Sequence, residues 1–196
     1  MYRVNEIFYS LQGEGRHTGR AAVFVRFSRC NLSCPFCDTD FDAHTQMTAD
    51  DIISAVSQWS NCGFVVLTGG EPSLQTDDIL IDAFHQAGFY VAAETNGTHP
   101  LPASVDWVTW SPKDLFAKHV PQLALNKIDE IKVVFDGEHD PECYRSISGD
   151  AYLSLQPCDT GNDERNRQIV SLCVDYILHH PHWHLSLQTH KLINIQ

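Results

Sequence analysis

The alternation of short β-rich runs with helical patterns is the feature of this sequence that most restricts its fold. Strands separated by helical crossovers pair in parallel, so the pattern predicts an α/β protein. A continuous apolar run such as FVVLT at residues 64–68 is typical of a parallel strand buried on both faces. The expected strands are residues 21–28, 64–68, 89–95, 106–110, 130–135, 152–156 and 185–188, with residues 4–9 as one more.

Three helices are expected between these strands. Residues 48–61 begin with Thr48, a good N-cap residue, and carry acidic residues in the first turn. Residues 76–87 and 162–179 carry apolar residues at helical spacing, and Pro181 stops the second of these patterns. The chain therefore alternates between the two element types over most of its length.

Polar and glycine-rich segments follow one expected strand after another. They are residues 30–39, 68–72, 94–97, 111–113, 156–157 and 188–190. Because the carboxyl ends of parallel strands meet at one edge of a sheet, we expect these segments to line one pocket. A complete eight-stranded barrel takes about 250 residues, whereas this chain has 196. The sequence therefore predicts a single domain, residues 1–196, built as an incomplete, TIM-like βα barrel of about six parallel strands.

Charge and hydropathy argue against several classes of partner. The chain carries 13 basic and 25 acidic residues, a net charge of −12, and shows no basic cluster that would track a nucleic-acid backbone. No apolar run approaches the roughly 20 residues that span a membrane. The first ten residues do not have the pattern of a signal peptide. A cytoplasmic protein that binds a small molecule is the expectation.

Three of the seven cysteines, Cys30, Cys34 and Cys37, lie within eight residues. An odd number of cysteines without an export signal argues against a disulfide framework. The spacing C-x3-C-x2-C supplies three thiolates from one loop, whereas iron–sulfur clusters usually bind four. One iron is then left open for a substrate or a cofactor. A closed zinc site, with His44 as its fourth ligand, is the alternative interpretation.

The cysteine loop, with an aromatic residue between its second and third cysteines, resembles the radical S-adenosylmethionine (SAM) superfamily. The resemblance implies a 4Fe–4S cluster whose open iron is chelated by SAM, and cleavage of SAM to a 5′-deoxyadenosyl radical. The segment Gly69-Gly70-Glu71-Pro72 resembles the part of that family that grips the SAM amino group. Glycines let a backbone approach a ligand closely, and a carboxylate accepts from an ammonium. Taken alone, this segment also suits an ordinary turn.

Further motifs are similar to those of the 7-carboxy-7-deazaguanine synthase family, from about Asn5 to the last residue. They are residues 11–15, Arg26, residues 38–39, residues 111–113 and residues 187–195. The resemblance implies conversion of 6-carboxy-5,6,7,8-tetrahydropterin to 7-carboxy-7-deazaguanine, with loss of ammonia, in the deazapurine branch that leads to queuosine. It also implies SAM and Mg²⁺ as cofactors, a flavodoxin-like electron donor and a homodimer.

The same resemblance implies a role for individual residues. The cluster ligands are Cys30, Cys34 and Cys37, and the magnesium ligand is Thr39. The SAM contacts are Phe36, Cys37, Asp38, Gly69, Gly70, Glu71, Ser111, Pro112 and Lys113. The substrate contacts are Leu11, Gln12, Gly13, Glu14, Arg26, Thr68 and, with the C-terminus folded back over the pocket, the carboxylate of Gln196.

These assignments make physical sense for a pterin that bears a carboxylate. Arg26 suits a bidentate clamp on that carboxylate, although a surface ion pair with a nearby acid is the ordinary use of such a residue. Gln12 and Glu14 suit the donor-rich edge of a pterin, although residues 12–15 also read as a turn between strands. A hard oxygen ligand such as Thr39 suits Mg²⁺, which shares the oxygens of its substrate.

Two rival functions fit parts of the pattern. An activase for a glycyl-radical protein carries the same cysteine spacing, but it needs a protein partner and leaves Glu14, Arg26 and Thr39 without a defined role. A non-catalytic zinc or iron–sulfur interaction module needs only the cysteine loop. Turnover of the carboxylated pterin without a partner protein would distinguish the synthase from the activase. SAM binding would distinguish the synthase from the non-catalytic module.

Overall fold

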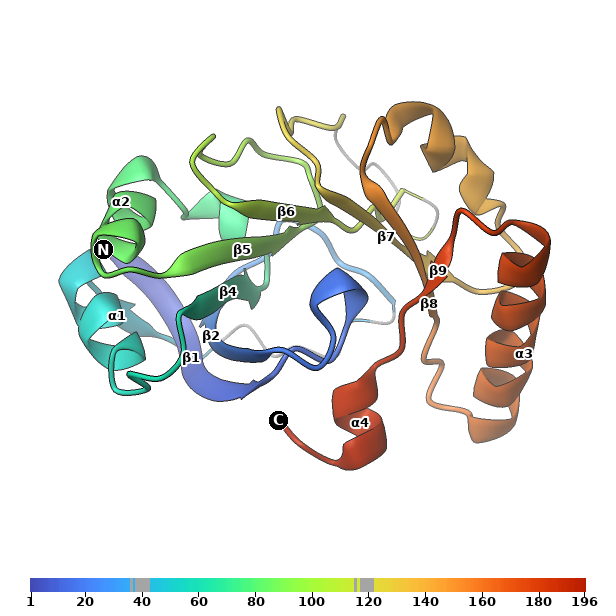
Figure 1. Cartoon of the computed structure of the whole chain (residues 1–196), viewed down its shortest axis with the longest axis horizontal. Coiled ribbons are helices and arrows are strands. Elements are labelled where there is room, and N and C mark those ends of the chain that lie inside the picture. Colours follow the sequence, from blue (N-terminus) through green and yellow to red (C-terminus); the bar gives the residue numbers. More distant parts are fainter. Residues whose placement is uncertain (36, 38–42, 115, 117–121) are drawn as a thin grey trace.

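The computed structural model describes residues 1–35, 37, 43–114, 116 and 122–196 of the chain. Within these residues one strongly curved sheet forms the centre of the molecule (Figure 1). Its strands are β1 (Tyr2–Leu11), β2 (Ala21–Phe27), β3 (Thr45–Met47), β4 (Phe64–Gly69), β5 (Tyr90–Thr95), β6 (Trp107–Trp110), β7 (Glu130–Phe135), β8 (Tyr152–Pro157) and β9 (His184–Leu185). The helices are α1 (Ala49–Val56), α2 (Asp78–Gln86), α3 (Asp163–His179) and α4 (Thr189–Ile193), with 3-10 turns η1 (Gly15–His17), η2 (Pro72–Leu74) and η3 (Pro141–Ile147).

The strand order β3-β1-β2-β4-β5-β6-β7-β8-β9 is that of an open α/β barrel. Neighbouring strands pair in parallel along the order β2-β4-β5-β6-β7-β8-β9. β1 runs antiparallel to both of its neighbours, β2 and β3. Figure 1 shows α1 and α2 beside one part of the curved sheet and α3 beside β8 and β9 at the other. The predicted incomplete barrel of about six parallel strands is confirmed, and the two-residue β9 adds a seventh at its edge.

Buried apolar side chains explain why the predicted strands form. Val65, Val66 and Leu67 of β4 are completely buried, as expected for a central strand covered on both faces. The N-terminal strand is longer than the predicted residues 4–9, because β1 pairs with β2 over most of its length. The prediction of a strand at residues 185–188 is wrong beyond Leu185, because Gln188 already serves as the N-cap of α4.

The three predicted helices form within about two residues of their expected starts, and α1 ends earlier than expected. The hydroxyl of Thr48 accepts from the Asp51 N–H, and the Asp51 carboxylate accepts from the Thr48 N–H, so a capping box starts α1. This helix ends at Val56 rather than at residue 61. The Asn162 side chain caps α3, which runs to His179 as predicted. None of the described helices is both long enough and apolar enough to cross a membrane.

The segment at residues 12–20, which we call the floor, crosses the amino ends of the parallel strands. Two backbone hydrogen bonds close its base: the Gln12 N–H donates to the Arg20 carbonyl (2.8 Å), and the Gly19 N–H donates to the Gln12 carbonyl (2.7 Å). The Arg16 N–H donates to the Glu130 carboxylate at the start of β7. The ring of His17 packs edge-on against Phe64, the first residue of β4, with the ring centroids 5.1 Å apart. The floor therefore holds Gln12, and the two residues that follow it, beneath the barrel interior.

Candidate active site

The carboxyl ends of the parallel strands and the floor enclose a cavity of about 320 Å³. Its wall contains residues from the cysteine loop, from the ends of β4, β5, β6 and β8, and from the C-terminal segment. The predicted site residues among its lining are Leu11, Gln12, Gly13, Glu14, Arg26, Cys30, Cys34, Cys37, Thr68, Gly69, Gly70, Glu71, Ser111, Lys113 and Gln196. The polar segments that follow successive strands thus meet in one place.

Four predicted contacts are not part of this lining. Pro112 is buried between Ser111 and Lys113, which do face the cavity. Phe36, Asp38 and Thr39 lie outside the described residues. Their predicted roles toward SAM and Mg²⁺ stay predictions.

The three cysteines of the loop share one wall of the cavity. All three are free thiols; Cys30 and Cys34 are half-buried and Cys37 is exposed. Burial raises the pKa of the thiols of Cys30 and Cys34. The Leu32 N–H lies 3.4 Å from the Cys30 sulfur, in the place of a donor to a metal-bound thiolate.

This donor set fits an iron–sulfur cluster. Clusters are held by cysteine thiolates, and N–H groups directed at the sulfurs tune them. Among the described residues, no three His, Cys, Asp or Glu side chains gather closely enough to hold a single metal ion. His44, the fourth ligand of the zinc alternative, is exposed.

The two glycines at the end of β4, Gly69 and Gly70, approach the chain's own backbone closely. Gly69 has φ +118°, which favours glycine, and a Cβ on Gly70 would lie 1.9 Å from the Arg29 carbonyl oxygen. One close neighbour of Gly70 is therefore the chain's own backbone just before Cys30, and the predicted contacts of Gly69 and Gly70 with SAM stay predictions. The two glycines let the end of β4 pack directly against the base of the cysteine loop.

Glu71 is a buried acceptor for its own protein. Its side chain is 1% exposed and accepts from the Ser73 N–H and hydroxyl, the Thr95 hydroxyl (2.5 Å) and the Asn96 N–H (2.7 Å). These four hydrogen bonds tie the turn after β4 to the end of β5. The predicted contact between Glu71 and the SAM ammonium stays a prediction, and the structure adds an internal role for the carboxylate.

Replacing Gly70 with alanine should destabilise the protein by about 1–3 kcal/mol or more, because the new methyl group overlaps backbone that cannot rotate away. Urea unfolding of the cluster-free protein measures this loss. Gly63→Ala is a matched control, since a Cβ there meets its nearest neighbour at 3.8 Å, an ordinary contact. Equal stability of the two variants would contradict the close approach at Gly70.

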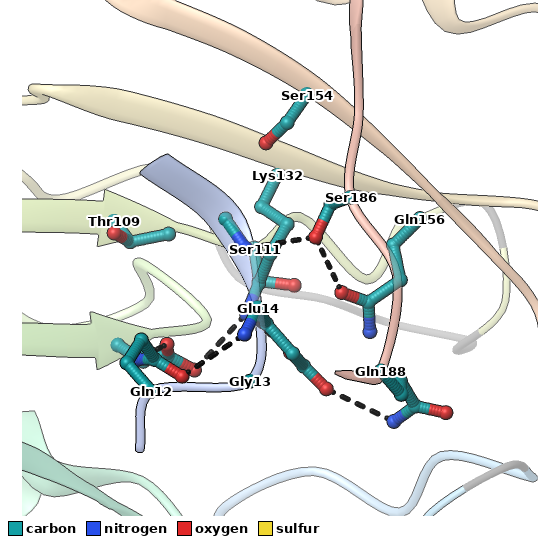
Figure 2. Close-up of polar contacts among 12 residues, drawn as sticks. Gln12, Gly13, Glu14, Thr109, Ser111, Lys132, Ser154, Gln156, Ser186 and Gln188 are labelled. Carbon is teal, nitrogen blue, oxygen red and sulfur yellow. Dashed lines mark hydrogen bonds and ion pairs between the residues drawn. The ribbon is translucent and has the colours of Figure 1, made fainter. Parts of the chain in front are cut away.

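A buried ionic cluster lies between the floor and the strands. The ammonium of Lys132, on β7, is 2.5 Å from the Glu14 carboxylate and 3.1 Å from that of Glu94. The Gln12 amide donates to Glu94 (2.8 Å), and the Gln188 amide donates to Glu14 (2.9 Å), as Figure 2 shows for Glu14. Two carboxylates and two amides therefore face the cavity in a fixed arrangement.

The Lys132 ammonium determines the charge of this cluster. Burial alone would raise the pKa of Glu14, but the charge of Lys132 and the hydrogen bonds from Lys132 and Gln188 lower it to about 2. Burial alone would lower the pKa of Lys132, and the carboxylates of Glu14 and Glu94 raise it instead. Glu14 and Lys132 therefore stay ionised at neutral pH.

The stability that Glu14 contributes should disappear in acid. The pKa of Glu14 is about 2 in the folded chain, below its ordinary value of 4.5, so Glu14 takes up its proton in the unfolded chain at a higher pH than in the folded chain. This stability is complete above about pH 4.5 and is lost as the pH falls toward the folded pKa. Urea unfolding from neutral pH to about pH 3 should show a shallower pH dependence for Glu14→Gln. Glu138→Gln, at a carboxylate that is 70% exposed, should leave the dependence unchanged.

Arg26 pairs with an acid of the chain. Its Nε lies 2.7 Å from Glu6, and both side chains are partly exposed. The Gln196 amide donates to the other oxygen of Glu6, and the Ser10 hydroxyl donates to the Gln196 main-chain oxygen. The C-terminus is thus folded back to the cavity, as expected, and the ion-pair alternative for Arg26 is also observed. A substrate carboxylate at Arg26 would compete with Glu6.

The cavity also contains residues to which no site role was assigned from the sequence. They are Phe8, Phe24, Leu32, Glu94, Thr95, Asn96, Lys132, Val134, Gln156, Pro157, Cys158, Asp159, Gln188, His190 and Lys191. Many of these belong to the polar segments that were expected at this edge. The signal for Lys132 was a cation inside the otherwise apolar strand EIKVVF, since a buried lysine needs a partner.

Comparisons with known proteins agree with this geometry. The family model of the Radical SAM superfamily matches residues 24–109. A 7-carboxy-7-deazaguanine synthase of Bacteroides thetaiotaomicron is 53% identical over 196 residues, which cover both chains completely. That of Bradyrhizobium diazoefficiens is 41% identical over 100% of this chain and 99% of the relative. The crystal structure of QueE from Escherichia coli matches with a TM-score of 0.79 and 28% identity, over 95% of this chain and 93% of that one.

Proposed function

Because this chain belongs to the 7-carboxy-7-deazaguanine synthase family of radical SAM enzymes, we propose that it converts 6-carboxy-5,6,7,8-tetrahydropterin to 7-carboxy-7-deazaguanine with loss of ammonia. The observation that carries the proposal is the shared cavity. The three thiols of the cysteine loop line the same cavity as Glu14 and Arg26, two groups suited to a carboxylated pterin. A glycyl-radical activase has no comparable use for these two side chains.

The family implies a 4Fe–4S cluster and SAM, and Cys30, Cys34 and Cys37 are the side chains that would hold the cluster. SAM bound there supplies the radical chemistry that removes a hydrogen atom from the substrate. The contribution of the protein is to bind, to orient and to exclude water. We assign the SAM side of the cavity to residues 69–71 and 111–113, where the Lys113 ammonium donates to the Ser111 hydroxyl.

The floor, with Glu94 of β5 and Gln188 before α4, is suited to the amino and ring N–H groups of a pterin. Glu14 and Glu94 are acceptors, and Gln12 and Gln188 each offer both a donor and an acceptor. The buried ammonium of Lys132 pairs with both carboxylates and lowers the pKa of Glu14, so Glu14 accepts strong, charge-assisted hydrogen bonds. Leu11, Gly13 and Thr68 complete the predicted substrate wall.

The carboxylate of the substrate is assigned to Arg26. Its guanidinium offers a planar pair of donors once the substrate replaces Glu6, its present partner. Gln196 lies beside Glu6 and adds a polar group at the same side of the cavity. We assign Mg²⁺ to Thr39, where a hard oxygen ligand and substrate oxygens would share the ion.

One assay tests the proposal. The anaerobically reconstituted and reduced protein is incubated with SAM, Mg²⁺ and the carboxylated tetrahydropterin, without any partner protein, and the product mass is determined. Formation of 7-carboxy-7-deazaguanine is the expected result. A protein that holds its cluster and binds SAM but leaves this pterin unchanged would contradict the substrate assignment. Omission of Mg²⁺ should lower turnover; unchanged turnover would contradict the magnesium assignment.

The remaining expectations from the family stay predictions. Sedimentation of the reconstituted protein tests the expected homodimer. Reduction of the cluster by purified flavodoxin tests the electron donor. The seven free cysteines are consistent with the reducing cytoplasm that we propose as its location.

A further inference from the structure

The cysteine loop is joined to the barrel by a closed ring of three side chains. Asn31, directly after Cys30, donates from Nδ2 to the Thr98 hydroxyl (2.8 Å). The Thr98 hydroxyl donates to Oδ1 of Asn96 (2.7 Å), and Asn96 Nδ2 donates back to Oδ1 of Asn31 (3.0 Å). Each of the three residues is both a donor and an acceptor, so removal of one group opens the whole ring.

Asn96 and Thr98, the two members of the ring that belong to the barrel, are held in place by several further hydrogen bonds. Asn96 and Thr98 follow β5 and are each 8% exposed. The Asn96 N–H donates to Glu71 (2.7 Å), and its carbonyl accepts from the Trp110 indole (3.1 Å). The Thr98 N–H also donates to Oδ1 of Asn96, which fixes the orientation of that amide. Asn31 therefore attaches the loop to a point that is held from several directions.

The loop side of the ring includes a group that acts on a cluster ligand. The Leu32 N–H, one residue after Asn31, lies 3.4 Å from the Cys30 sulfur. Asn31 itself is exposed, so it adds little to the core, and its two side-chain hydrogen bonds both go to the turn after β5. The two hydrogen bonds of Asn31 therefore serve mainly to fix the backbone between Cys30 and Leu32.

We propose that Asn31 is a positioning residue for the iron–sulfur cluster: together with Asn96 and Thr98 it fixes the peptide between Cys30 and Leu32. The peptide then holds the Cys30 sulfur at the cluster and directs an N–H group to it. The inference rests on the proposed function, because it requires the cluster at Cys30. Groups that orient metal ligands in this way typically account for 10–100-fold in metal affinity.

The test measures loss of iron from the whole, anaerobically loaded protein after addition of an iron chelator. Asn31→Ala and Thr98→Val should each release iron about tenfold faster than the unchanged protein. The double variant should be no faster than about twice the quicker single variant, because either change opens the ring. Thr98→Ser, which keeps the hydroxyl, should retain the original rate. If the increases in the iron-release rate multiply in the double variant, the three side chains do not act as one unit, and the proposal is contradicted.

A matched control separates this role from general stability. Asn162→Ala also removes an asparagine side chain with two hydrogen bonds, those that cap α3. It should lower the unfolding midpoint of the cluster-free protein and leave iron release unchanged. Asn31→Ala should leave the unfolding midpoint of the cluster-free protein unchanged and should speed iron release from the loaded protein. The cluster of Asn31→Ala should also have a more negative midpoint potential, because an N–H group near a sulfur favours the reduced cluster.

The outcomes distinguish this inference from the proposed function. If the unchanged protein does not take up about four irons, the cluster assignment fails, and the inference fails with it. If the unchanged protein holds its cluster while Asn31→Ala releases iron at the same rate, only the inference is overturned. Faster release that accompanies an equally lowered unfolding midpoint would also overturn it, since a structural role alone would then account for both changes.

Discussion

Cys34→Ala should reduce turnover of the carboxylated pterin to background and remove the bound iron. The chain would then offer two thiolates from the loop, whereas a cluster that binds SAM at an open iron needs all three. Iron and sulfide content, the visible absorbance of the cluster and SAM cleavage measure the loss. Because Cys34 is only half-buried, the cluster-free variant should unfold at nearly the same urea concentration as the unchanged protein.

Cys143→Ala is the matched control for this substitution. Cys143 is also a free thiol but is exposed on η3, and it does not line the cavity. This variant should keep both its iron and its turnover. A Cys34→Ala protein with a complete cluster and normal activity would exclude the radical SAM mechanism for this site.

Lys132→Met should lower the free energy of unfolding by about 3–5 kcal/mol, the cost of breaking a buried ion pair by removing one partner. The Lys132 side chain is 5% exposed, and its removal would leave the carboxylates of Glu14 and Glu94 facing each other without a cation. Urea unfolding of the cluster-free protein measures the effect. The surviving Glu14 carboxyl should also lose the charge that lowers its pKa.

Removal of all three charges should restore most of this stability. The triple variant Lys132→Met, Glu14→Gln, Glu94→Gln leaves no unpaired charge, so it should be more stable than Lys132→Met alone. It should remain inactive, because the ionised acceptors proposed for the pterin are gone. Arg145→Met, at a 60% exposed ion pair, should change stability by about 1 kcal/mol or less. A Lys132→Met protein as stable as Arg145→Met would contradict the buried cluster.

The elements that could be predicted from the sequence are those that carry their own signal. The continuous apolar run of β4 and the capping residues of α1 and α3 identify these elements without reference to the rest of the chain. β3 is three residues long and mostly exposed, and it exists because it pairs with β1. α4 has five residues and no side-chain cap, so its position depends on tertiary contacts.

The site residues also fall into two groups: those that a local sequence pattern identifies, and those that depend on contacts between distant parts of the chain. The cysteine spacing is local, and it led to the cavity residues Cys30, Cys34 and Cys37. The pairing of Glu14 with Lys132 spans 118 residues and exists only because the floor passes beneath β7. The link from Glu71 to Thr95 and Asn96 could not be predicted either, because these partners lie 24 and 25 residues away in the sequence.

The floor has a consequence for the order of events in catalysis. The floor crosses the amino ends of the strands, so a pterin at Glu14, as proposed above, would lie farther from the carboxyl ends of the strands than a cofactor near Gly70 and Lys113. With that placement we expect ordered binding, in which the pterin enters before SAM.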